Sequence, residues 1–340
     1  AGWWAGDNHV PVLKSRSDVE VVGVCRLGRS ELSRFKEKFG IEFATEDYRE
    51  LLDRVPMDGV VVSSPHPLHY EQARASLEKG LHVLCEKPMV LRTSEARELV
   101  DLAEKNKRHF LIPYGWNYAS FTSDAKRQIE AGRIGEIRHL TCQMAGATQT
   151  LFSGQEPFFV KDVAFKPALD TWNDPQKGGG YGYGQTTHML GLVLWITGLE
   201  ASEVFAMMGL SPTGADLFHS ISGRFSNGAT ATVSGSAGVP EHLGYQVDVR
   251  IFGTEGMLLL DLESGRERLE IRRRDGDDFV REMKPGEGTY DCKEPLNRFV
   301  DLILGWDVEN NSPAELGARV VQFLEATYRS AESGKAEKVS

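Results

Sequence analysis

Between residues 18 and 115, short β-branched runs alternate with helical stretches, and this alternation constrains the fold more than any other feature of the chain. Residues 19–25 (VEVVGVC) are typical of a buried strand, and residues 30–39 are typical of a helix that ends at a glycine. Parallel strands joined by right-handed helical crossovers have this pattern. The other elements expected here are helices over 47–53, 69–79 and 94–105 and strands over 59–63, 81–85 and 110–114. We therefore predict a parallel α/β domain at the start of the chain.

After about Phe121 the strands become longer and polar residues alternate with apolar ones, as in a sheet with one covered face. Asn227 and Gly228 stand between two of these strands and predict a tight hairpin turn. Strands are expected over 136–144, 203–208, 219–225, 229–234, 245–252, 257–262 and 268–273, and helices over 123–131, 188–197, 294–304 and 313–333. We predict two domains, 1–118 and 119–340. The second is an α+β domain with a large, open, mostly antiparallel sheet, and its last helix could return to the first domain.

The charge balance and the cysteines exclude several classes of protein. Among 340 residues, 49 Asp and Glu outweigh 39 Lys and Arg, whereas nucleic-acid binders carry a basic face. The four cysteines are widely spaced and form no C-x-x-C pair, which favours reduced thiols in a cytoplasm over a disulfide framework. No apolar stretch reaches the ~20 residues that cross a bilayer. We expect neither a nucleic acid nor a membrane among the partners.

The first six residues, AGWWAG, are typical of the tail of a G-x-G-x-x-[GA] dinucleotide fingerprint. Gly2 would let the backbone approach a pyrophosphate, with Trp3 and Trp4 beside it, and Ala5 would let the helix pack on the sheet. The first glycine and the strand before it are expected upstream of Ala1. An ordinary glycine turn is the alternative, but the strand that follows supports a Rossmann dinucleotide-binding domain.

The residue that reads the adenosine ribose is expected at the end of strand 19–25, where the sequence has Arg26. An acidic residue there would accept hydrogen bonds from a free 2′-hydroxyl, whereas the guanidinium groups of Arg26 and Arg29 suit a 2′-phosphate. Two solvated surface arginines are the alternative. We predict NADP as the cofactor in preference to NAD.

Two further segments follow the ends of predicted strands, where ligands of open α/β sheets bind. Residues 63–69 (SSPHPLH) contain an S-P-x-x-x-H pattern, and E-K-P follows strand 81–85. With these two segments the chain resembles the Gfo/Idh/MocA family of NAD(P)-dependent sugar and polyol dehydrogenases. The cofactor contacts that we predict in the two segments are Ser63, Ser64, His66, His69, Glu86, Lys87 and Pro88.

Residues 178–188 (GGGYGYGQTTH) and the apolar helix after them support this resemblance, because members of the family have a GGG run, a D-x-x-x-H pair and such a helix. The resemblance implies that Glu86 and Lys87 line the nicotinamide end, that Lys87 also touches the substrate oxygen, and that His188 is the general base. A histidine with a pKa near ~6.5 can accept the proton of a secondary alcohol. A lysine ammonium stabilises the alkoxide that develops. A packing role at the start of the helix is the alternative for His188.

The sequence departs from the family at Gly184, which stands where the aspartate of the pair is expected. Gln185, Asp174 or Tyr183 is expected to supply a replacement hydrogen bond. Asp174 comes first because it lies just before the glycine run, although an ordinary Asp-Pro turn is an equal alternative. A second departure is Ala119, where relatives often have an arginine, so the identity of the substrate does not carry over.

Several aromatic residues could stack on the apolar face of a sugar ring or, alternatively, fill the space between the two domains. They are Trp116, Trp172, Tyr181 and Tyr183. Asn117, which the family pattern retains, is expected to contact cofactor or sugar. The substrate-binding residues that we predict are Lys87, Trp116, Trp172, Asp174, Tyr183, Gln185 and His188. His66 and His69 have no acidic or cysteine cluster beside them, so we predict no metal site.

We predict an enzyme that transfers a hydride between nicotinamide and a secondary hydroxyl or carbonyl of a sugar, an inositol or a related polyol. Gly184 keeps two alternatives open. One is a cofactor-binding sensor without turnover, and the other is an enzyme that retains its cofactor and uses transient oxidation for elimination or epimerisation. The uncovered face of the large sheet predicts a homodimer or a homotetramer, as the resemblance also implies.

Overall fold

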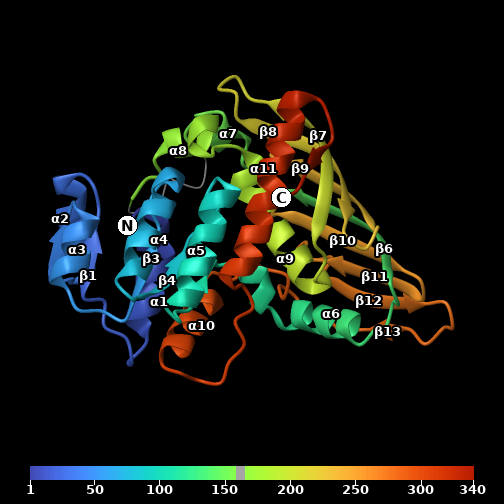
Figure 1. Ribbon diagram of the computed structural model, residues 1–340, viewed down its shortest axis with the longest axis horizontal. Coiled ribbons are helices and arrows are strands. Elements are labelled where there is room, and N and C mark those ends of the chain that lie inside the picture. Colours follow the sequence, from blue (N-terminus) through green and yellow to red (C-terminus); the bar gives the residue numbers. More distant parts are fainter. Residues whose placement is uncertain (158–164) are drawn as a thin grey trace. The chain divides into compact units, whose positions relative to one another are not determined.

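The computed structural model describes residues 1–157 and 165–340, which form two compact units (Figure 1). Unit 1 comprises Ala1–Pro113, the described residues 165–168 and Cys292–Gly317. Unit 2 comprises Tyr114–Pro157, Leu169–Asp291 and Ala318–Ser340. The sequence prediction left open a return of the last helix to the first domain, and the start of that helix, up to Gly317, belongs to unit 1. It did not include the returns at residues 165–168 and 292–304, because local sequence patterns do not report them.

Unit 1 is built from parallel strands, as predicted. β1 (Gly23–Cys25) pairs with β2 (Phe43–Thr45). A second sheet has the order β3 (Gly59–Val62), β4 (His82–Cys85) and β5 (Phe110–Leu111). Every one of these pairs is parallel. β1 is shorter than the strand predicted over 19–25, because only its last three residues pair with β2.

The helices of unit 1 begin and end close to the predicted residues because their caps are encoded locally. α2 (Arg29–Phe39) ends at Gly40, which has a left-handed φ of +59°. α3 (Tyr48–Arg54) begins after Asp47, whose carboxylate accepts the N–H of Arg49. The other helices of this unit are η1 (Ala5–His9), α1 (Val10–Ser15), η2 (His66–Leu68), α4 (His69–Glu78), α5 (Thr93–Lys105) and α10 (Glu294–Ile303).

Two apolar clusters form the core of unit 1. The first surrounds the fully buried ring of Phe35 and includes Phe165, so the short segment at 165–168 is part of this core. The second joins Leu84 and Leu111 to Leu296 and Phe299 of α10. Burial of these side chains is what ties the late segment 292–317 to the first domain.

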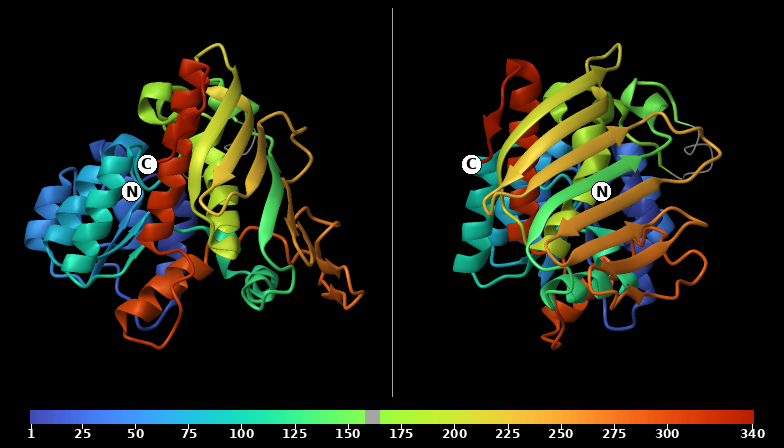
Figure 2. Two further views of the ribbon diagram at one scale, coloured as in Figure 1. Left: turned by 45° about the vertical axis from the view of Figure 1, so that its right-hand side comes forward. Right: turned by 90° about the vertical axis from the view of Figure 1, so that its right-hand side faces the viewer.

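Unit 2 contains a sheet of nine strands in the order β13-β12-β11-β10-β6-β9-β8-β7-β14, seen face-on at the right of Figure 2. β6 and β9 are parallel, and all other neighbours are antiparallel, which confirms the predicted mostly antiparallel sheet. The strands are β6 (Ile137–Ala145), β7 (Ala201–Leu210), β8 (Asp216–Phe225), β9 (Thr230–Ser236), β10 (Gln246–Gly253), β11 (Gly256–Asp261), β12 (Arg268–Arg273), β13 (Phe279–Val280) and β14 (Glu337–Lys338).

Helices cover one face of this sheet. Every second residue along its strands is therefore buried, as in β8. α9 (Thr187–Thr197) is buried along almost its whole length, and α11 (Ala314–Ser333) packs Phe323 against Gly223 of β8. Gly228 has a φ of +85° in the turn between β8 and β9, so the predicted hairpin is confirmed. The remaining helices of unit 2 are η3 (Gly115–Tyr118), α6 (Ser120–Glu130), α7 (Gln149–Phe152), α8 (Leu169–Asn173), η5 (Pro175–Lys177) and η6 (Gly182–Thr186).

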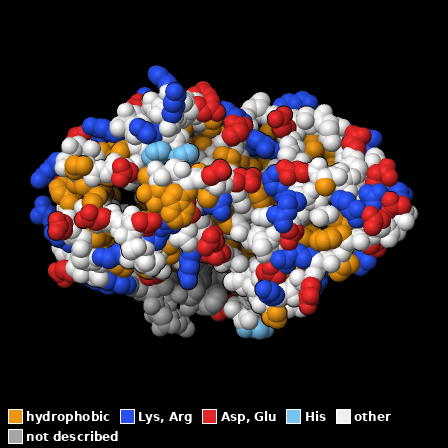
Figure 3. All heavy atoms as spheres, turned by 90° about the horizontal axis from the view of Figure 1, so that it is seen from below, with side chains coloured by type: hydrophobic (Ala, Val, Ile, Leu, Met, Phe, Trp, Pro, Cys, Tyr) orange, Lys and Arg blue, Asp and Glu red, His pale blue; other side chains and the backbone are white. Residues whose placement is uncertain are grey.

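The surface mixes both signs of charge. On the face shown in Figure 3, acidic and basic side chains lie interspersed, without a continuous basic field. No helix in the described ranges has the length and hydropathy that a membrane crossing requires. The four cysteines are free. Within residues 1–157 and 165–340, no group of His, Cys, Asp and Glu side chains has the geometry of a metal site.

Candidate active site

Gly2 lies next to the residue that follows the carboxyl end of β3. A Cβ built on Gly2 would be 3.5 Å from the carbonyl oxygen of Ser63, and the Gly2 carbonyl accepts the N–H of Gly6 at the start of η1. The rings of Trp3 and Trp4 meet edge to face at 5.3 Å. A helix start at the end of a parallel strand presents backbone N–H groups to a phosphate.

The hydroxyl of Ser64 gives an independent indication of a ligand at this edge. Its Oγ is buried and has no hydrogen-bond partner among the described residues. A buried hydroxyl normally has a partner, so a donor or acceptor is missing here. Together with Gly2, this orphaned hydroxyl at the end of β3 fits a dinucleotide cofactor.

Arg26 follows β1, as expected for the residue that reads the ribose. Its guanidinium donates to the carbonyl of Ala1 at 2.8 Å and lies 3.5 Å from Glu31. It also stacks over the ring of Phe165, 5.0 Å from the ring centroid. Burial lowers the pKa of Arg26, although the group stays cationic at any ordinary pH.

Arg34 and Arg29 add further positive charge near Arg26. Arg34, on α2, lies 5.3 Å from the same Phe165 ring and pairs with Glu31. The side chain of Arg29 is 95% exposed and lies 3.5 Å from Glu46. Both carboxylates therefore partly neutralise the arginines that were predicted to bind a 2′-phosphate.

His69, a predicted cofactor contact, is fully buried. Its Nδ1 lies 2.8 Å from the carbonyl oxygen of Pro88, and its Nε2 lies 2.9 Å from that of Ser64. Burial lowers the pKa of His69. The imidazole thus joins the loop after β3 to the loop after β4. His66 is also buried, and its ring lies 5.8 Å from the His69 ring.

Glu86 and Lys87 follow β4, and the sequence prediction missed the partner of Glu86. The Glu86 carboxylate lies 2.8 Å from Nε2 of His9, which is buried in η1. Burial raises the pKa of Glu86, but His9 and the neighbouring Lys87 together lower it below its usual value. The carboxylate is therefore ionised and fixed.

The side chain of Lys87 is half-buried, and its backbone N–H donates to Glu86 at 3.2 Å. Burial lowers the pKa of Lys87, while Glu86 and Cys292 oppose this shift. A lysine with a lowered pKa exchanges a proton more readily near neutral pH.

His188 lies in the first turn of α9, surrounded by aromatic rings. The ring of Tyr290 is 4.9 Å away, that of Trp116 6.1 Å and that of Tyr114 6.4 Å, all edge to face with the imidazole. His188 is 7% exposed. These rings fix the plane of the imidazole, and Tyr290 is the one of the three that is not buried.

The aromatic cluster is held by backbone hydrogen bonds from two loops. Trp116 donates its indole N–H to the carbonyl of Gly288 at 3.0 Å, and the Gly115 N–H donates to the Tyr290 hydroxyl at 3.1 Å. Tyr290 did not stand out in the sequence, because nothing local marks a loop tyrosine far along the chain. Asn117 is fully buried, and its amide donates to the carbonyl of Gly191 at 3.5 Å, which joins η3 to α9.

Gly184 lies in η6, directly before the helix that carries His188. A Cβ at this position would be 2.6 Å from the ring of Phe152, closer than real Cβ contacts. The aromatic ring of Phe152 thus fills the space into which a side chain at 184 would point. This packing is the physical reason for the missing aspartate.

The three residues expected to replace that aspartate have other contacts or remain without an assigned role. The Asp174 carboxylate accepts the N–H of Gln176 at 2.9 Å and lies 4.0 Å from Lys177, so it forms the ordinary Asp-Pro turn. The ring of Tyr183 stacks on that of Tyr328 at 4.7 Å. Gln185 is buried in η6. Its contact with the substrate stays a prediction.

The other predicted aromatic residues also pack within unit 2. Trp172 lies 6.3 Å from the ring of Phe152, and its carbonyl accepts the N–H of Gly180. Tyr181 is fully buried, and burial raises its pKa well above the usual value. Its exposure is too small for stacking on a sugar.

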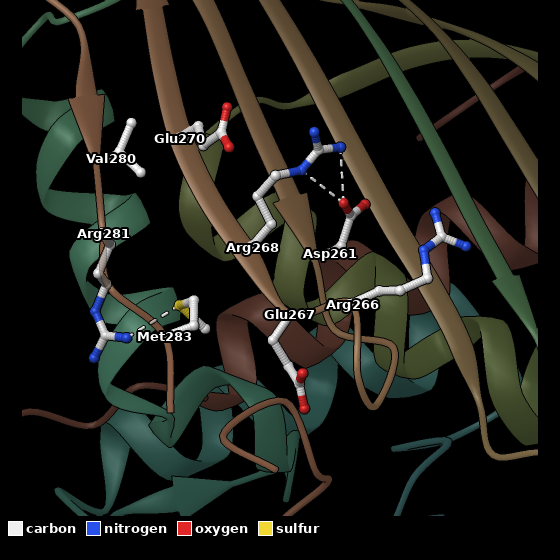
Figure 4. Close-up of a pocket in the computed structure, with 8 residues that line it drawn as sticks. All are labelled: Asp261, Arg266, Glu267, Arg268, Glu270, Val280, Arg281 and Met283. Atoms are coloured by element: carbon white, nitrogen blue, oxygen red, sulfur yellow. Dashed lines mark hydrogen bonds and ion pairs between the residues drawn. The ribbon is translucent and has the colours of Figure 1, made fainter. Parts of the chain in front are cut away.

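A shallow pocket of about 450 Å³ lies over β11, β12 and β13, and none of the predicted site residues lines it (Figure 4). In the close-up the Arg268 guanidinium points at Asp261, to which its Nε donates at 2.8 Å. Arg281, at the edge of this pocket, donates to Glu287 at 2.6 Å and to Asp124 at 2.6 Å. This pairing fastens the loop that leads to Tyr290.

The sequence matches two models of one family in succession. Residues 1–114 match "Oxidoreductase family, NAD-binding Rossmann fold", and residues 122–259 match "GFO/IDH/MocA C-terminal domain". Together the two matches cover most of the chain.

Curated relatives and solved structures agree with this match. The chain is 34% identical over 137 residues to D-glucoside 3-dehydrogenase of Escherichia coli, covering 40% of this chain and 39% of that enzyme. It is 24% identical to glucose-6-phosphate 3-dehydrogenase of Bacillus subtilis, covering 88% and 80%. The WlbA dehydrogenase from Bordetella pertussis, solved with NADH and UDP-GlcNAcA, shares the fold with a TM-score of 0.78 at 20% identity, covering 98% and 95%. The chain belongs to the Gfo/Idh/MocA family of NAD(P)-dependent oxidoreductases.

Proposed function

We propose that this enzyme oxidises a secondary hydroxyl of a sugar, an inositol or a related polyol, and that Lys87 and His188 act on the oxygen of that hydroxyl. The observation that carries the proposal is the setting of His188, an imidazole held by the rings of Trp116, Tyr290 and Tyr114. Trp116 and Tyr114 are buried and fix the imidazole, whereas the partly exposed ring of Tyr290 is able to stack on the C–H face of a pyranose while the imidazole accepts a proton.

The chemistry divides between the two side chains. Oxidation of a secondary alcohol removes the hydroxyl proton and a hydride from the same carbon. Neutral His188 accepts the proton, and the Lys87 ammonium stabilises the oxygen as negative charge develops on it. The lowered pKa of Lys87 suits this role, because an ammonium with a lower pKa is a stronger acid and therefore a stronger hydrogen-bond donor to an oxygen that becomes negative.

The cofactor is held, in this proposal, by Gly2 and Ser64 at the end of β3 and by Glu86 and Lys87 after β4. When bound, nicotinamide supplies the acceptor for the hydride. We propose NADP over NAD, because Arg26 stands where NAD enzymes of this fold have an acidic residue. Glu31 and Glu46 reduce the net positive charge around Arg26 and Arg29, so we expect NADP to be preferred over NAD but not to be the exclusive cofactor.

The names of two relatives indicate where on the sugar the reaction takes place. D-glucoside 3-dehydrogenase and glucose-6-phosphate 3-dehydrogenase are both named for position 3 of a glucose ring. We therefore propose a glucoside or glucose derivative, oxidised at C3, as the first substrate class to test. Inositols are the second substrate class to test, because they also carry secondary hydroxyls on a six-membered ring.

The test is nicotinamide absorbance over time with glucosides, free sugars, sugar phosphates and inositols, each with NADP and with NAD. A rise in absorbance with a glucoside, and a 3-keto product by mass spectrometry and NMR, supports the proposal. Product formed without added cofactor, together with cofactor retained through purification, would indicate transient internal oxidation instead. Cofactor binding with no product from any of these compounds would contradict the proposal.

We also propose that two copies of the chain associate through the uncovered face of the large sheet. Phe205 and Met207 of β7 and Phe218 of β8 are exposed there, and Met207 is 63% exposed. The register places Met207 opposite Ser220 and Gly209 opposite Phe218, so the three apolar side chains share one face of the sheet. Apolar patches on a sheet face mark an interface.

A further inference from the structure

We propose that Asp216, on β8, is a positioning residue that holds the turn before His188. With His219 and Tyr328 it fixes the position of η6. The inference rests on the proposed role of His188 as the base. It adds a residue that the family pattern around position 184 does not contain.

Asp216 caps the start of η6 from a distant strand. It is 2% exposed, and its Oδ2 accepts the N–H of Gly182 at 2.9 Å. Its Oδ1 accepts the hydroxyl proton of Tyr328 at 2.8 Å, and that hydroxyl oxygen accepts the N–H of Tyr183 at 3.3 Å. The first N–H groups of a helix have no partner within the helix, and negative charge is stabilising there. The carboxylate and the phenol therefore supply the partners that η6 lacks.

His219 connects the same carboxylate to the other end of the turn. Its Nδ1 lies 3.5 Å from Asp216 and its Nε2 lies 2.9 Å from Oγ1 of Thr186, the last residue of η6. The tautomer with the proton on Nδ1 satisfies both contacts, with the Thr186 hydroxyl donating to Nε2. His219 is 4% exposed and Thr186 is fully buried. Thr187 and His188 follow directly.

The glycine run makes room for this network. A Cβ at Gly180 would overlap Oδ1 of Asp216, and a Cβ at Gly182 would overlap the hydroxyl oxygen of Tyr328. Gly180 also has a φ of +117°, which L side chains rarely adopt. The glycines at 180 and 182 thus allow Asp216 to reach the backbone, while Gly184 accommodates Phe152.

Loss of the hydrogen bonds among Asp216, His219 and Thr186 is expected to displace the imidazole of His188. A displacement of about 1 Å at a reacting group lowers the rate by up to about 100-fold. Asp216→Asn removes the charge, and Thr186→Val removes the bond to His219 at nearly constant volume. We expect Asp216→Asn to lower kcat by about 10- to 100-fold with unchanged dissociation constant for NADP. Thr186→Val should lower kcat by a smaller factor.

Asp261→Asn is the matched control. Asp261 is 3% exposed on β11 and pairs with Arg250 and Arg268, without contact to η6. A purely structural carboxylate lowers the melting temperature without changing kcat per folded molecule. We therefore expect Asp261→Asn to keep the kcat of the parent, whereas Asp216→Asn should lower it. If Asp216→Asn does not fold, Thr186→Val is compared with Asp261→Asn instead.

A readout that does not depend on turnover separates this inference from the proposed function. The imidazole resonances of His188, assigned by their loss in His188→Gln, should shift in Asp216→Asn or Thr186→Val and stay in place in Asp261→Asn. Absence of turnover in the unmodified enzyme would contradict the proposed function alone. Unshifted His188 resonances, or an unchanged kcat in both variants near η6, would overturn the positioning role of Asp216.

Discussion

The ring of Phe152 lies where a side chain at Gly184 would go, since a Cβ there would be 2.6 Å from the nearest ring carbon. Restoring the aspartate of the family pattern would therefore place both extra volume and a charge against an aromatic ring. Gly184 and Phe152 therefore form a packed pair, and we expect a larger side chain at position 184 to require a smaller one at position 152.

Gly184→Asp should therefore destabilise the protein. Overpacking of a filled core costs about 1–3 kcal/mol, and an unpaired buried carboxylate costs more. In urea unfolding, Gly184→Asp combined with Phe152→Ala should lose less than the sum of the two single losses, because the smaller residue makes room. Strict additivity, or a Gly184→Asp variant as stable as the parent, would show that Phe152 does not exclude the aspartate.

Arg26→Asp should shift the cofactor preference from NADP toward NAD. Hydrogen bonds to charged groups contribute about 1.5–3 kcal/mol, so the ratio of kcat/KM for the two cofactors should change by about 10- to 100-fold. Arg49→Asp, at a 64% exposed position on α3, is the control and should leave the ratio unchanged. An unchanged ratio in Arg26→Asp would refute a phosphate-binding role for this arginine.

Glu287 should make stability depend on pH in the acid range. Hydrogen bonds from Arg281, opposed by burial, lower the pKa of Glu287 from its usual 4.5 to about 2. Because this folded-state pKa lies below the unfolded value, the stabilisation is complete above about pH 4.5 and is lost as the pH falls toward 2.

Glu287→Gln tests this dependence. The difference in unfolding free energy between parent and variant should be constant near neutral pH and should shrink below about pH 4.5. Glu263→Gln, which breaks the exposed pair with Arg266, should show little effect at any pH. A difference for Glu287→Gln that does not change with pH would contradict the pairing with Arg281.

Met207→Asp should weaken the association of subunits. A charge in the centre of an apolar patch opposes its burial against a second copy. Sedimentation velocity should show a shift toward monomers, whereas Leu304→Asp, at another exposed apolar residue in unit 1, should not change the assembly. A monomeric parent protein would remove the basis for this interface.

Much of the fold could be predicted because its signals are local. α2 ends at Gly40, and the β8–β9 turn contains Gly228. Both positions have a positive φ, which favours glycine, so the glycines in the sequence predict the helix end and the turn. β2 was missed because its three residues, FAT, form no long β-branched run. The return of α10 to unit 1 depends on the burial of Leu296 and Phe299, which no local pattern reports.

The site shows the same division. Lys87 and His188 could be proposed from the sequence because they stand at the end of a strand and the start of a helix in a family pattern. His9 and Tyr290 were missed because their partners lie far away in the chain. The burial of His69 could not be predicted, because a sequence pattern does not distinguish a buried imidazole from an exposed one.

The most direct test of the central claim compares the parent enzyme with His188→Gln on the best substrate of the glucoside panel. Loss of a general base lowers turnover by about 10²- to 10⁴-fold, while the dissociation constant for NADP, measured by fluorescence, should not change. His242→Gln, at an exposed histidine of the same unit, should retain full activity. Full turnover in His188→Gln would contradict the assignment of the base and with it the proposed mechanism.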